Sequence, residues 1–177
     1  MKKILIVDDE AANLRALERL FRKDHHVLTA ESGSDALALL EQYDVALLVT
    51  DQRMPGMTGI ELLQKTVPLR PHMVRILLTG YTDVNTLIEA VNCGLVYKYL
   101  TKPWNNDDLC VTVSRAIEHF EANKARHTLE MTNQRLRVRL REISEIATQD
   151  EQLLGNPEVS LSPSIQDGGQ LDLIASN

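Results

Sequence analysis

Five side chains that could do chemistry stand at the ends of short apolar runs in the sequence. Asp8 and Asp9 follow the first run, and Asp51 follows the third. Thr79 ends the fourth run, and Lys102 follows the fifth. If the runs are parallel strands of one sheet, their carboxyl ends share one edge. Three carboxylates, a hydroxyl and an ammonium group would then meet there.

Carboxylates gathered at one edge need a cation, because like charges within a few ångströms force one group to take a proton. A divalent ion with oxygen ligands resolves this conflict, and Mg²⁺ in proteins uses one or two carboxylates together with phosphate and water. Lys102 adds a fixed positive charge. Phosphoryl transfer depends on positioning and charge neutralisation, and carboxylates are established nucleophiles for it. The residues therefore indicate a site suited to a phosphoryl group.

The elements that must position these groups are short strands alternating with helices. Between the apolar runs lie segments whose apolar residues recur at helical spacing, and one of them contains Leu87, Ile88 and Val91. Five alternations of strand and helix are typical of a parallel sheet with helices on both faces. We expect an α/β domain with a five-stranded, parallel, doubly wound sheet. Its strands are expected at Ile4–Val7, Val27–Ala30, Val45–Thr50, Val74–Thr79 and Tyr97–Thr101.

Four local motifs together resemble the receiver domain of two-component response regulators. They are Ile4–Glu10, Val49–Gly59, Leu78–Tyr81 and Tyr99–Trp104. Any one would be weak, but all four occur in the family's order and at its spacing. The resemblance covers residues 1–120, roughly two-thirds of the chain. It implies the flavodoxin-like form of the doubly wound fold.

The resemblance also implies roles for the acidic residues. Asp51 would be the phosphoacceptor, taking a phosphoryl group from a sensor histidine kinase or a phosphotransfer protein. Asp8, Asp9, Asp51 and the backbone carbonyl of Arg53 would hold Mg²⁺, with Asp9 the more direct ligand of the pair. The protein would then be no enzyme in the ordinary sense, because it would catalyse only its own phosphorylation and dephosphorylation.

Further roles follow from the same resemblance. Lys102 would contact the phosphoryl oxygens, and its bond to Pro103 would be the family's cis peptide. Thr79 would donate its hydroxyl to the phosphoryl group, and Tyr99 would be the aromatic switch that turns inward as Thr79 moves. The phosphate would bias the two states of the domain.

Two bulky residues are expected to modulate the lifetime of the phosphoryl group. Arg53 lies two residues after Asp51, and Tyr81 lies two residues after Thr79. Both flank the expected path of the hydrolytic water, so we hypothesise slow self-dephosphorylation. Taken singly, the site residues also have structural interpretations. An Asp pair can cap a helix, and a lone lysine is usually a solvated charge.

The chain beyond residue 120 predicts a helical extension over 121–154 and a flexible tail over 155–177. Asn106 is the expected cap of the helix, and neither Gly nor Pro follows it until Gly155. Apolar residues recur at seven-residue spacing, which favours a coiled coil and a parallel homodimer. A helix folded back on the receiver, or a frayed extension, is the alternative. One edge of the seam is Ala122, Leu129, Leu136 and Ile143, and the other is Asn133, Leu140 and Ala147.

Composition narrows the classes of function. The 177 residues carry a net charge of −6, which argues against a dedicated nucleic-acid binder, and the arginine-rich stretch 135–141 lacks interleaved aromatic residues. No apolar run approaches the length of a membrane span, and the N-terminus is no signal peptide. Cys93 and Cys110 have no metal-ligand spacing, so a cytoplasmic protein is the simplest interpretation.

Two classes of function stay open from the sequence. The first is a signalling module that phosphorylation switches to control dimerisation or a protein partner. The second is the regulatory front of a larger effector, either a cyclic-nucleotide phosphodiesterase or a transcription regulator. The amino-acid sequences of segments 51–56 and 99–104 resemble those of receiver domains attached to such proteins. A phosphate shuttle without output is a minor third option.

Overall fold

The structure is a computed structural model that describes residues 1–80, 91 and 94–154. It contains two compact units, which are described separately. The first is Met1–Met131, and the second begins at Thr132.

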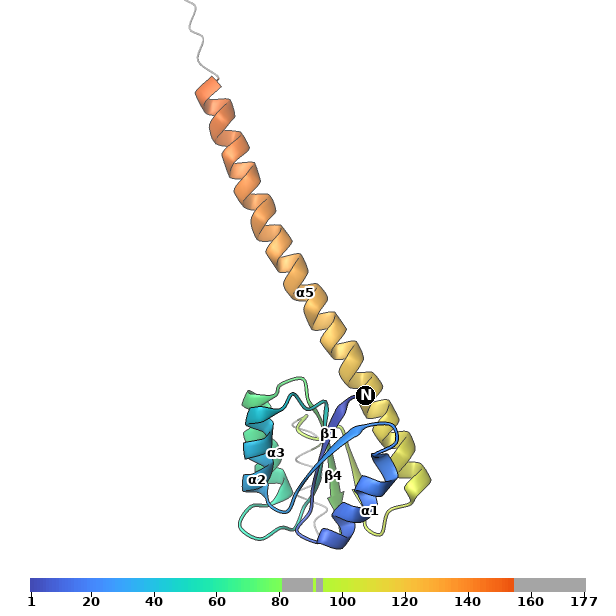
Figure 1. The fold of residues 1–177 in the computed structure, drawn as a ribbon. Coiled ribbons are helices and arrows are strands. Elements are labelled where there is room, and N and C mark those ends of the chain that lie inside the picture. The colour runs from blue at the N-terminus through green and yellow to red at the C-terminus, as the bar shows by residue number, and fades with distance from the viewer. Residues whose placement is uncertain (81–90, 92–93, 155–177) are drawn as a thin grey trace, which may run out of the picture. The chain divides into compact units, whose positions relative to one another are not determined.

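The first unit is built on a five-stranded sheet in the order β2-β1-β3-β4-β5, and all neighbouring strands are parallel (Figure 1). This arrangement confirms the expected flavodoxin-like fold. Strands that cross over to parallel neighbours bring their carboxyl ends to one edge, and Asp8, Asp51 and Lys102 stand at these ends. The strands are β1 (Lys3–Val7), β2 (His26–Ala30), β3 (Leu47–Asp51), β4 (Val74–Thr79) and β5 (Lys98–Thr101).

Helices cover both faces of this sheet (Figure 1). On one face α1 (Ala11–Phe21) and the first part of α5 (Asn106–Leu154) pack against the strands. On the other face lie α2 (Gly33–Gln42) and α3 (Gly59–Leu69). A strand with helices on both sides has no solvated face, which explains its nearly continuous apolar sequence.

The central strand β3 shows how the alternation of side chains builds two cores. Leu47 and Val49 point into the cluster with α1 and α5, whereas Leu48 points into the cluster with α2 and α3. All three are fully buried. Burial of each such side chain stabilises the fold by about 1.5–3 kcal/mol. The paired clusters therefore fix the register that places Asp51 at the end of the strand.

The observed strands differ from the expected ones at one informative point. The third was expected at Val45–Thr50, but β3 extends to Asp51. Asp51 pairs in register with Leu78, and the next amide, that of Gln52, donates to the Leu78 carbonyl at 2.9 Å. The carboxylate of Asp51 is thus held on the sheet itself. The helix expected around Leu87 and Ile88 lies outside the described residues.

Two arginines fasten helix ends at the opposite edge of the sheet. Arg75, at the start of β4, is buried and donates to the carbonyls of Thr66, Arg70 and Met73 at 3.0, 2.7 and 2.7 Å. Its Nε also donates to Thr66 Oγ1 at 2.9 Å. Arg70 donates to the Leu40 carbonyl at 2.6 Å, near the end of α2. The bonds to Thr66, Arg70 and Leu40 satisfy carbonyls that α3 and α2 leave unpaired at their ends.

Helix α5 runs from Asn106 to Leu154 and passes through residue 120, where the sequence predicted a division. The expected cap, Asn106, is wrong by one residue. The Asn105 side chain accepts from the amides of Asp107 and Asp108 at 2.8 and 3.2 Å. Asn105 can cap because it stands just before the first helical residue.

In the second unit, α5 carries large apolar side chains that are exposed. They are Leu136 (51%), Val138 (51%), Leu140 (65%), Ile143 (62%) and Ile146 (59%). The predicted tail, residues 155–177, lies outside the described residues. Among the helices of the described ranges, none is long and apolar enough to cross a lipid bilayer.

Candidate functional site

The carboxyl edge of the sheet brings together Asp8, Asp51 and Lys102, as the sequence predicted. Lys102 Nζ lies 2.8 Å from Asp8 Oδ2 and 2.5 Å from Asp51 Oδ1. Asp8 is fully buried and Asp51 is 5% exposed. One ammonium group therefore bridges two buried carboxylates that come from neighbouring strands.

The electrostatics of this bridge favour the charged lysine. Burial opposes the charge on Lys102, but hydrogen bonds and Coulomb attraction from Asp51 and Asp8 outweigh it. The pKa of Lys102 is consequently raised above its ordinary value of 10.5. The ammonium provides the cation that two adjacent carboxylates require.

Asp8 also accepts hydrogen bonds from the start of α1. The Glu10 amide donates to Asp8 Oδ1 at 2.9 Å. The Asn13 amide group donates to both oxygens, at 3.1 Å to Oδ1 and 3.2 Å to Oδ2. Asn13 was not predicted as a site residue. Its only sequence signal is an amide side chain five residues after Asp8, in the first turn of a helix.

The loop after Asp51 is ordered around its carboxylate. The Arg53 amide donates to Asp51 Oδ2 at 2.8 Å. The buried side chain of Gln52 accepts from the Ile60 amide at 3.2 Å, and the Gln52 carbonyl accepts from the Gly59 amide at 3.0 Å. The first residues of α3 are thereby tied to the end of β3.

Gly59 makes this close approach feasible. A Cβ atom there would overlap the Asp51 carbonyl oxygen and would lie 2.7 Å from Leu77 Cδ1. Real Cβ atoms are not found at such separations, so only glycine fits without a shift of the backbone. Glycine is required because the backbone at position 59 contacts the backbone of Asp51 across the loop. The sequence pattern does not reveal this contact.

Thr79 ends β4 beside the site. It is buried, and its hydroxyl donates to the Gly80 carbonyl at 3.0 Å. The Lys102 amide donates to the Thr79 carbonyl at 2.8 Å, so the two strand ends are joined by their backbones. The peptide bond between Lys102 and Pro103 is cis, which confirms that expectation.

Three other predicted site residues have exposed side chains. Asp9 is exposed, and so is the side chain of Arg53. Tyr99, on β5, is 46% exposed. Tyr81 lies outside the described residues.

The donor set suits a hard divalent cation. Among the described residues, no group of three or more His, Cys, Asp or Glu side chains is arranged to hold a metal ion. Mg²⁺ does not require such a group, because it binds through one or two carboxylates with phosphate and water. Asp8 and Asp51 present carboxylate oxygens around one position, which the ammonium of Lys102 now neutralises.

A cavity of about 510 Å³ opens beside the bridge. Its walls are Glu10 and Asn13 from the start of α1, and Lys102, Pro103 and Trp104 after β5. Three of these residues, Glu10, Asn13 and Lys102, contact Asp8 directly. The cavity therefore opens to solvent beside Lys102, the cation of the bridge.

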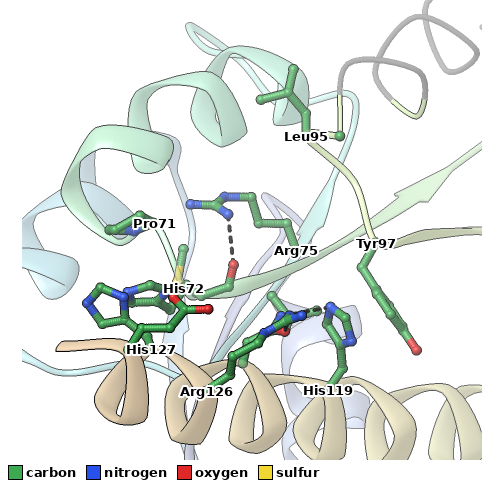
Figure 2. Close-up of a pocket in the computed structure, with 13 residues that line it drawn as sticks. Pro71, His72, Arg75, Leu95, Tyr97, His119, Arg126 and His127 are labelled. Atoms are coloured by element: carbon green, nitrogen blue, oxygen red, sulfur yellow. Dashed lines mark hydrogen bonds between the residues drawn. The ribbon is translucent and has the colours of Figure 1, made fainter. Parts of the chain in front are cut away.

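A second cavity, of about 350 Å³, lies at the amino ends of β4 and β5 (Figure 2). The rings of His72 and His127 are 4.5 Å apart there, and Asn123 bonds both His119 and Arg126. Asp51 and Lys102 are not among the residues that line it. Because it adjoins the opposite ends of the strands, it is separate from the carboxylate site.

The geometry agrees with comparisons to known proteins. Residues 4–114 match the response regulator receiver domain. The chain is 40% identical over 128 residues to the hydrogenase transcriptional regulatory protein HoxA of Cupriavidus necator. This match covers 72% of the chain but only 27% of HoxA, so the chain spans about a quarter of the length of that relative.

Solved structures give the same result. A crystal structure of adenylate cyclase from Rhodopirellula baltica is 36% identical, covers 72% of this chain and 96% of that chain, and has a TM-score of 0.71. A CheY-like receiver domain protein from Methanospirillum hungatei is 32% identical, with coverage of 70% and 98% and a TM-score of 0.66. The family match extends over more than half of the sequence. The chain therefore belongs to the response regulator receiver domain family.

Proposed function

We propose that this protein is a phosphorylation-controlled switch in which Asp51 accepts a phosphoryl group. Receiver domains of response regulators interact with histidine kinases or phosphotransfer proteins, and response regulators are generally not enzymes. The donor here would be such a kinase or carrier. The chain would catalyse only its own phosphorylation and dephosphorylation.

The observation that carries the proposal is the bridge between Lys102 and Asp51. Lys102 Nζ is 2.5 Å from the carboxylate that would attack the phosphorus atom, and it is only 23% exposed. An ammonium held there can neutralise charge on the equatorial phosphoryl oxygens, which is the main task in phosphoryl transfer. A solvated lysine on a surface would not be shared between two buried carboxylates.

Magnesium completes the proposed site. Receiver domains generally bind Mg²⁺ at the phosphorylation site. Asp8, Asp9, Asp51 and the Arg53 carbonyl would hold it in this chain. The bound ion would neutralise charge on the incoming phosphoryl oxygens. Asp51 supplies the nucleophilic oxygen, while Asp8 keeps Lys102 within reach of it.

The response to phosphorylation would involve Thr79 and Tyr99. Thr79 is buried next to the site, and its hydroxyl is bonded to the neighbouring Gly80 carbonyl. That hydroxyl would turn to the phosphoryl group, and Tyr99, now 46% exposed, would turn inward. Phosphate then biases a two-state element because it binds one state better than the other.

Arg53 would prolong the life of the phosphoryl group. Its amide is bonded to Asp51, and its side chain is exposed two residues beyond that carboxylate. A bulky group in this position obstructs in-line attack by water. Tyr81 would act in the same way.

The output of the switch is proposed to be assembly through α5, in a cytoplasmic protein without direct contacts to nucleic acid. The exposed Leu136, Leu140 and Ile143 recur on one face of the helix at coiled-coil spacing. Pairing of two copies would bury this face. A transcription regulator with a separate output domain is the second candidate, favoured by the 40% identity to HoxA.

Phosphorylation itself is the decisive test. The chain is incubated with acetyl phosphate and Mg²⁺, and its intact mass is measured over time beside Asp51→Asn. We expect the wild type to gain one phosphoryl group and the variant to gain none. Absence of the gain in the wild type, or an equal gain in Asp51→Asn, would contradict the proposal.

A further inference from the structure

The side chain of Asn13 clamps the carboxylate of Asp8. Its Nδ2 lies 3.1 Å from Oδ1 and 3.2 Å from Oδ2. A carboxylate only accepts hydrogen bonds, so the amide must present its NH₂ group to Asp8 and direct its oxygen away. The contact to both oxygens restricts rotation of the carboxylate about its own axis.

The carboxylate of Asp8 has no exposed surface, so its charge depends on donors from the protein. In the described part of the chain these donors are the backbone amide of Glu10, the side-chain amide of Asn13 and the ammonium of Lys102. Oδ1 takes the first, Oδ2 takes the last, and Asn13 spans both. Asn13 therefore helps to fix the orientation of Oδ2 toward Lys102.

Lys102 passes this orientation on to Asp51. Its ammonium is shared between Asp8 Oδ2 at 2.8 Å and Asp51 Oδ1 at 2.5 Å. If the Asp8 carboxylate rotates, Lys102 must either follow it or lose one of its two partners. Asn13, Asp8, Lys102 and Asp51 thus form one continuous chain of hydrogen bonds.

We propose that Asn13 is a positioning residue for phosphoryl transfer to Asp51. It fixes the Asp8 carboxylate, and that carboxylate holds Lys102 against the nucleophile. The inference rests on the proposed function of Asp51 and adds a residue to its machinery. Removal of a side chain that orients another side chain of the site typically lowers activity by about 10–100-fold.

A purely structural role for Asn13 makes a different prediction. Asn13 lies in the first turn of α1, and the residue before that helix, Glu10, makes no side-chain capping bond. The contact to Asp8 therefore also ties α1 to the end of β1. A tether of this kind would lower stability without slowing the reaction of molecules that remain folded.

Because of the position of Asn13, the experiment must distinguish an effect on donor binding from an effect on the rate of phosphoryl transfer. Asn13 lines the cavity of about 510 Å³ through which a phosphodonor would reach the site. A role in contacting the donor would raise KM. A role in positioning would lower the maximal rate and leave KM nearly unchanged.

The experiment compares the full chain with Asn13→Leu, Asn13→Gln and Arg15→Ala. Leucine matches the size of asparagine but cannot donate, and glutamine keeps the amide on a longer arm. Arg15 is exposed on the same helix and serves as the matched control. Phosphorylation by acetyl phosphate with Mg²⁺ is followed by intact mass across donor concentrations. Thermal unfolding gives the folded fraction of each variant.

We expect Asn13→Leu to lower the maximal rate by about tenfold or more, with KM nearly unchanged. Asn13→Gln recovers part of the rate, and Arg15→Ala keeps all of it. If the leucine variant does not fold, Asn13→Ala replaces it. The fluorescence of Trp104, the one tryptophan of the sequence, gives a second readout of beryllofluoride binding beside Lys102. Asn13→Leu should weaken that binding as well.

A wild-type maximal rate in Asn13→Leu would overturn the proposal, and so would an effect confined to KM or to the folded fraction. Failure of the proposed function has a different signature. In that case the wild-type chain and Asp51→Asn would show the same gain in mass, or none. The proposed role of Asn13 would then be wrong as well.

Discussion

The ammonium of Lys102 and the carboxylate of Asp51 lie 2.5 Å apart, although the two residues are 51 positions apart in the sequence. Asp8 takes the other side of the same ammonium at 2.8 Å. Three strand ends thus converge on one cation. Its removal would leave two buried carboxylates facing each other.

Replacement of Lys102 by methionine should therefore destabilise the fold by about 2 kcal/mol or more, because Asp8 and Asp51 lose their shared partner. Adding Asp8→Asn should recover part of this loss, since one of the two repelling charges is then gone. Urea denaturation followed by circular dichroism measures both effects. Lys65→Met, on the exposed surface of α3, is the control. If the losses of unfolding free energy in Lys102→Met and Asp8→Asn simply add in the double variant, Lys102 is not a cation shared by Asp8 and Asp51.

Gly59→Ala should destabilise the protein by about 1–3 kcal/mol, because its Cβ would overlap the Asp51 carbonyl and force α3 away from β3. Gly80→Ala is a useful comparison, as a Cβ there meets no described atom within 4 Å. Denaturation midpoints of the two variants give the difference. Equal stabilities would show that the loop yields more easily than its geometry indicates.

Arg75→Met should cost about 3 kcal/mol, since the carbonyls of Thr66, Arg70 and Met73 would lose a buried charged donor. Arg75→Lys should recover only a minor part, because one ammonium cannot reproduce the fork of a guanidinium. Arg115→Met, on the exposed side of α5, serves as control. Full rescue by lysine would show that charge alone matters at this position.

Acid should weaken the fold through His25. Burial lowers the pKa of His25 below its ordinary value of 6.5, despite the opposing effect of Asp24. The unfolded chain therefore binds this proton more readily, so the contribution of His25 to stability is present above pH 6.5 and is lost as the pH falls through the lowered pKa. Denaturation at pH 7.5 and 5.5 measures the loss.

The variant His25→Phe should have a shallower dependence on pH than the wild type over this range. The ring of His25 already lies near Phe21, with centroids 6.4 Å apart, so an aromatic replacement keeps that contact. His26→Phe, on an exposed neighbour, provides the control. A dependence that is unchanged in His25→Phe would assign the acid effect to other groups.

Assembly through α5 is tested by a matched pair of substitutions. Leu136 and Val138 are each 51% exposed, but only Leu136 belongs to the seven-residue seam. Leu136→Lys should shift the molar mass in light scattering toward the monomer, whereas Val138→Lys should leave it unchanged. A wild-type chain that is monomeric with and without Mg²⁺ and beryllofluoride would rule out the dimer.

Much of the site could be predicted because parallel strands deliver their carboxyl ends to a common edge. Asp8 and Asp51 stand at the ends of β1 and β3, which are buried on both faces, and Lys102 follows β5, which is largely exposed. Asn13 and Gly59 could not be predicted in this way. Their roles depend on how closely α1 and α3 approach the strand ends, and the direction of an amide or the lack of a Cβ becomes informative only once that distance is known.

The same limit applied to Arg75. An arginine inside a run of buried strand residues looks like an interruption of the apolar pattern, yet its charge is used to satisfy the last carbonyls of α3. The strand prediction was correct because the neighbours of Arg75 are apolar. The partners of its guanidinium are Thr66 on α3 and Arg70 and Met73 beyond it, and these positions carry no distinctive sequence pattern.

Helix α3 is consequently held at both ends. Arg75 donates three hydrogen bonds at its last turn, and Gly59, its first residue, packs against the backbone of Asp51. Because contacts hold both ends of α3, we expect a change at Asp51 to alter the angle of the helix rather than its position along its own axis.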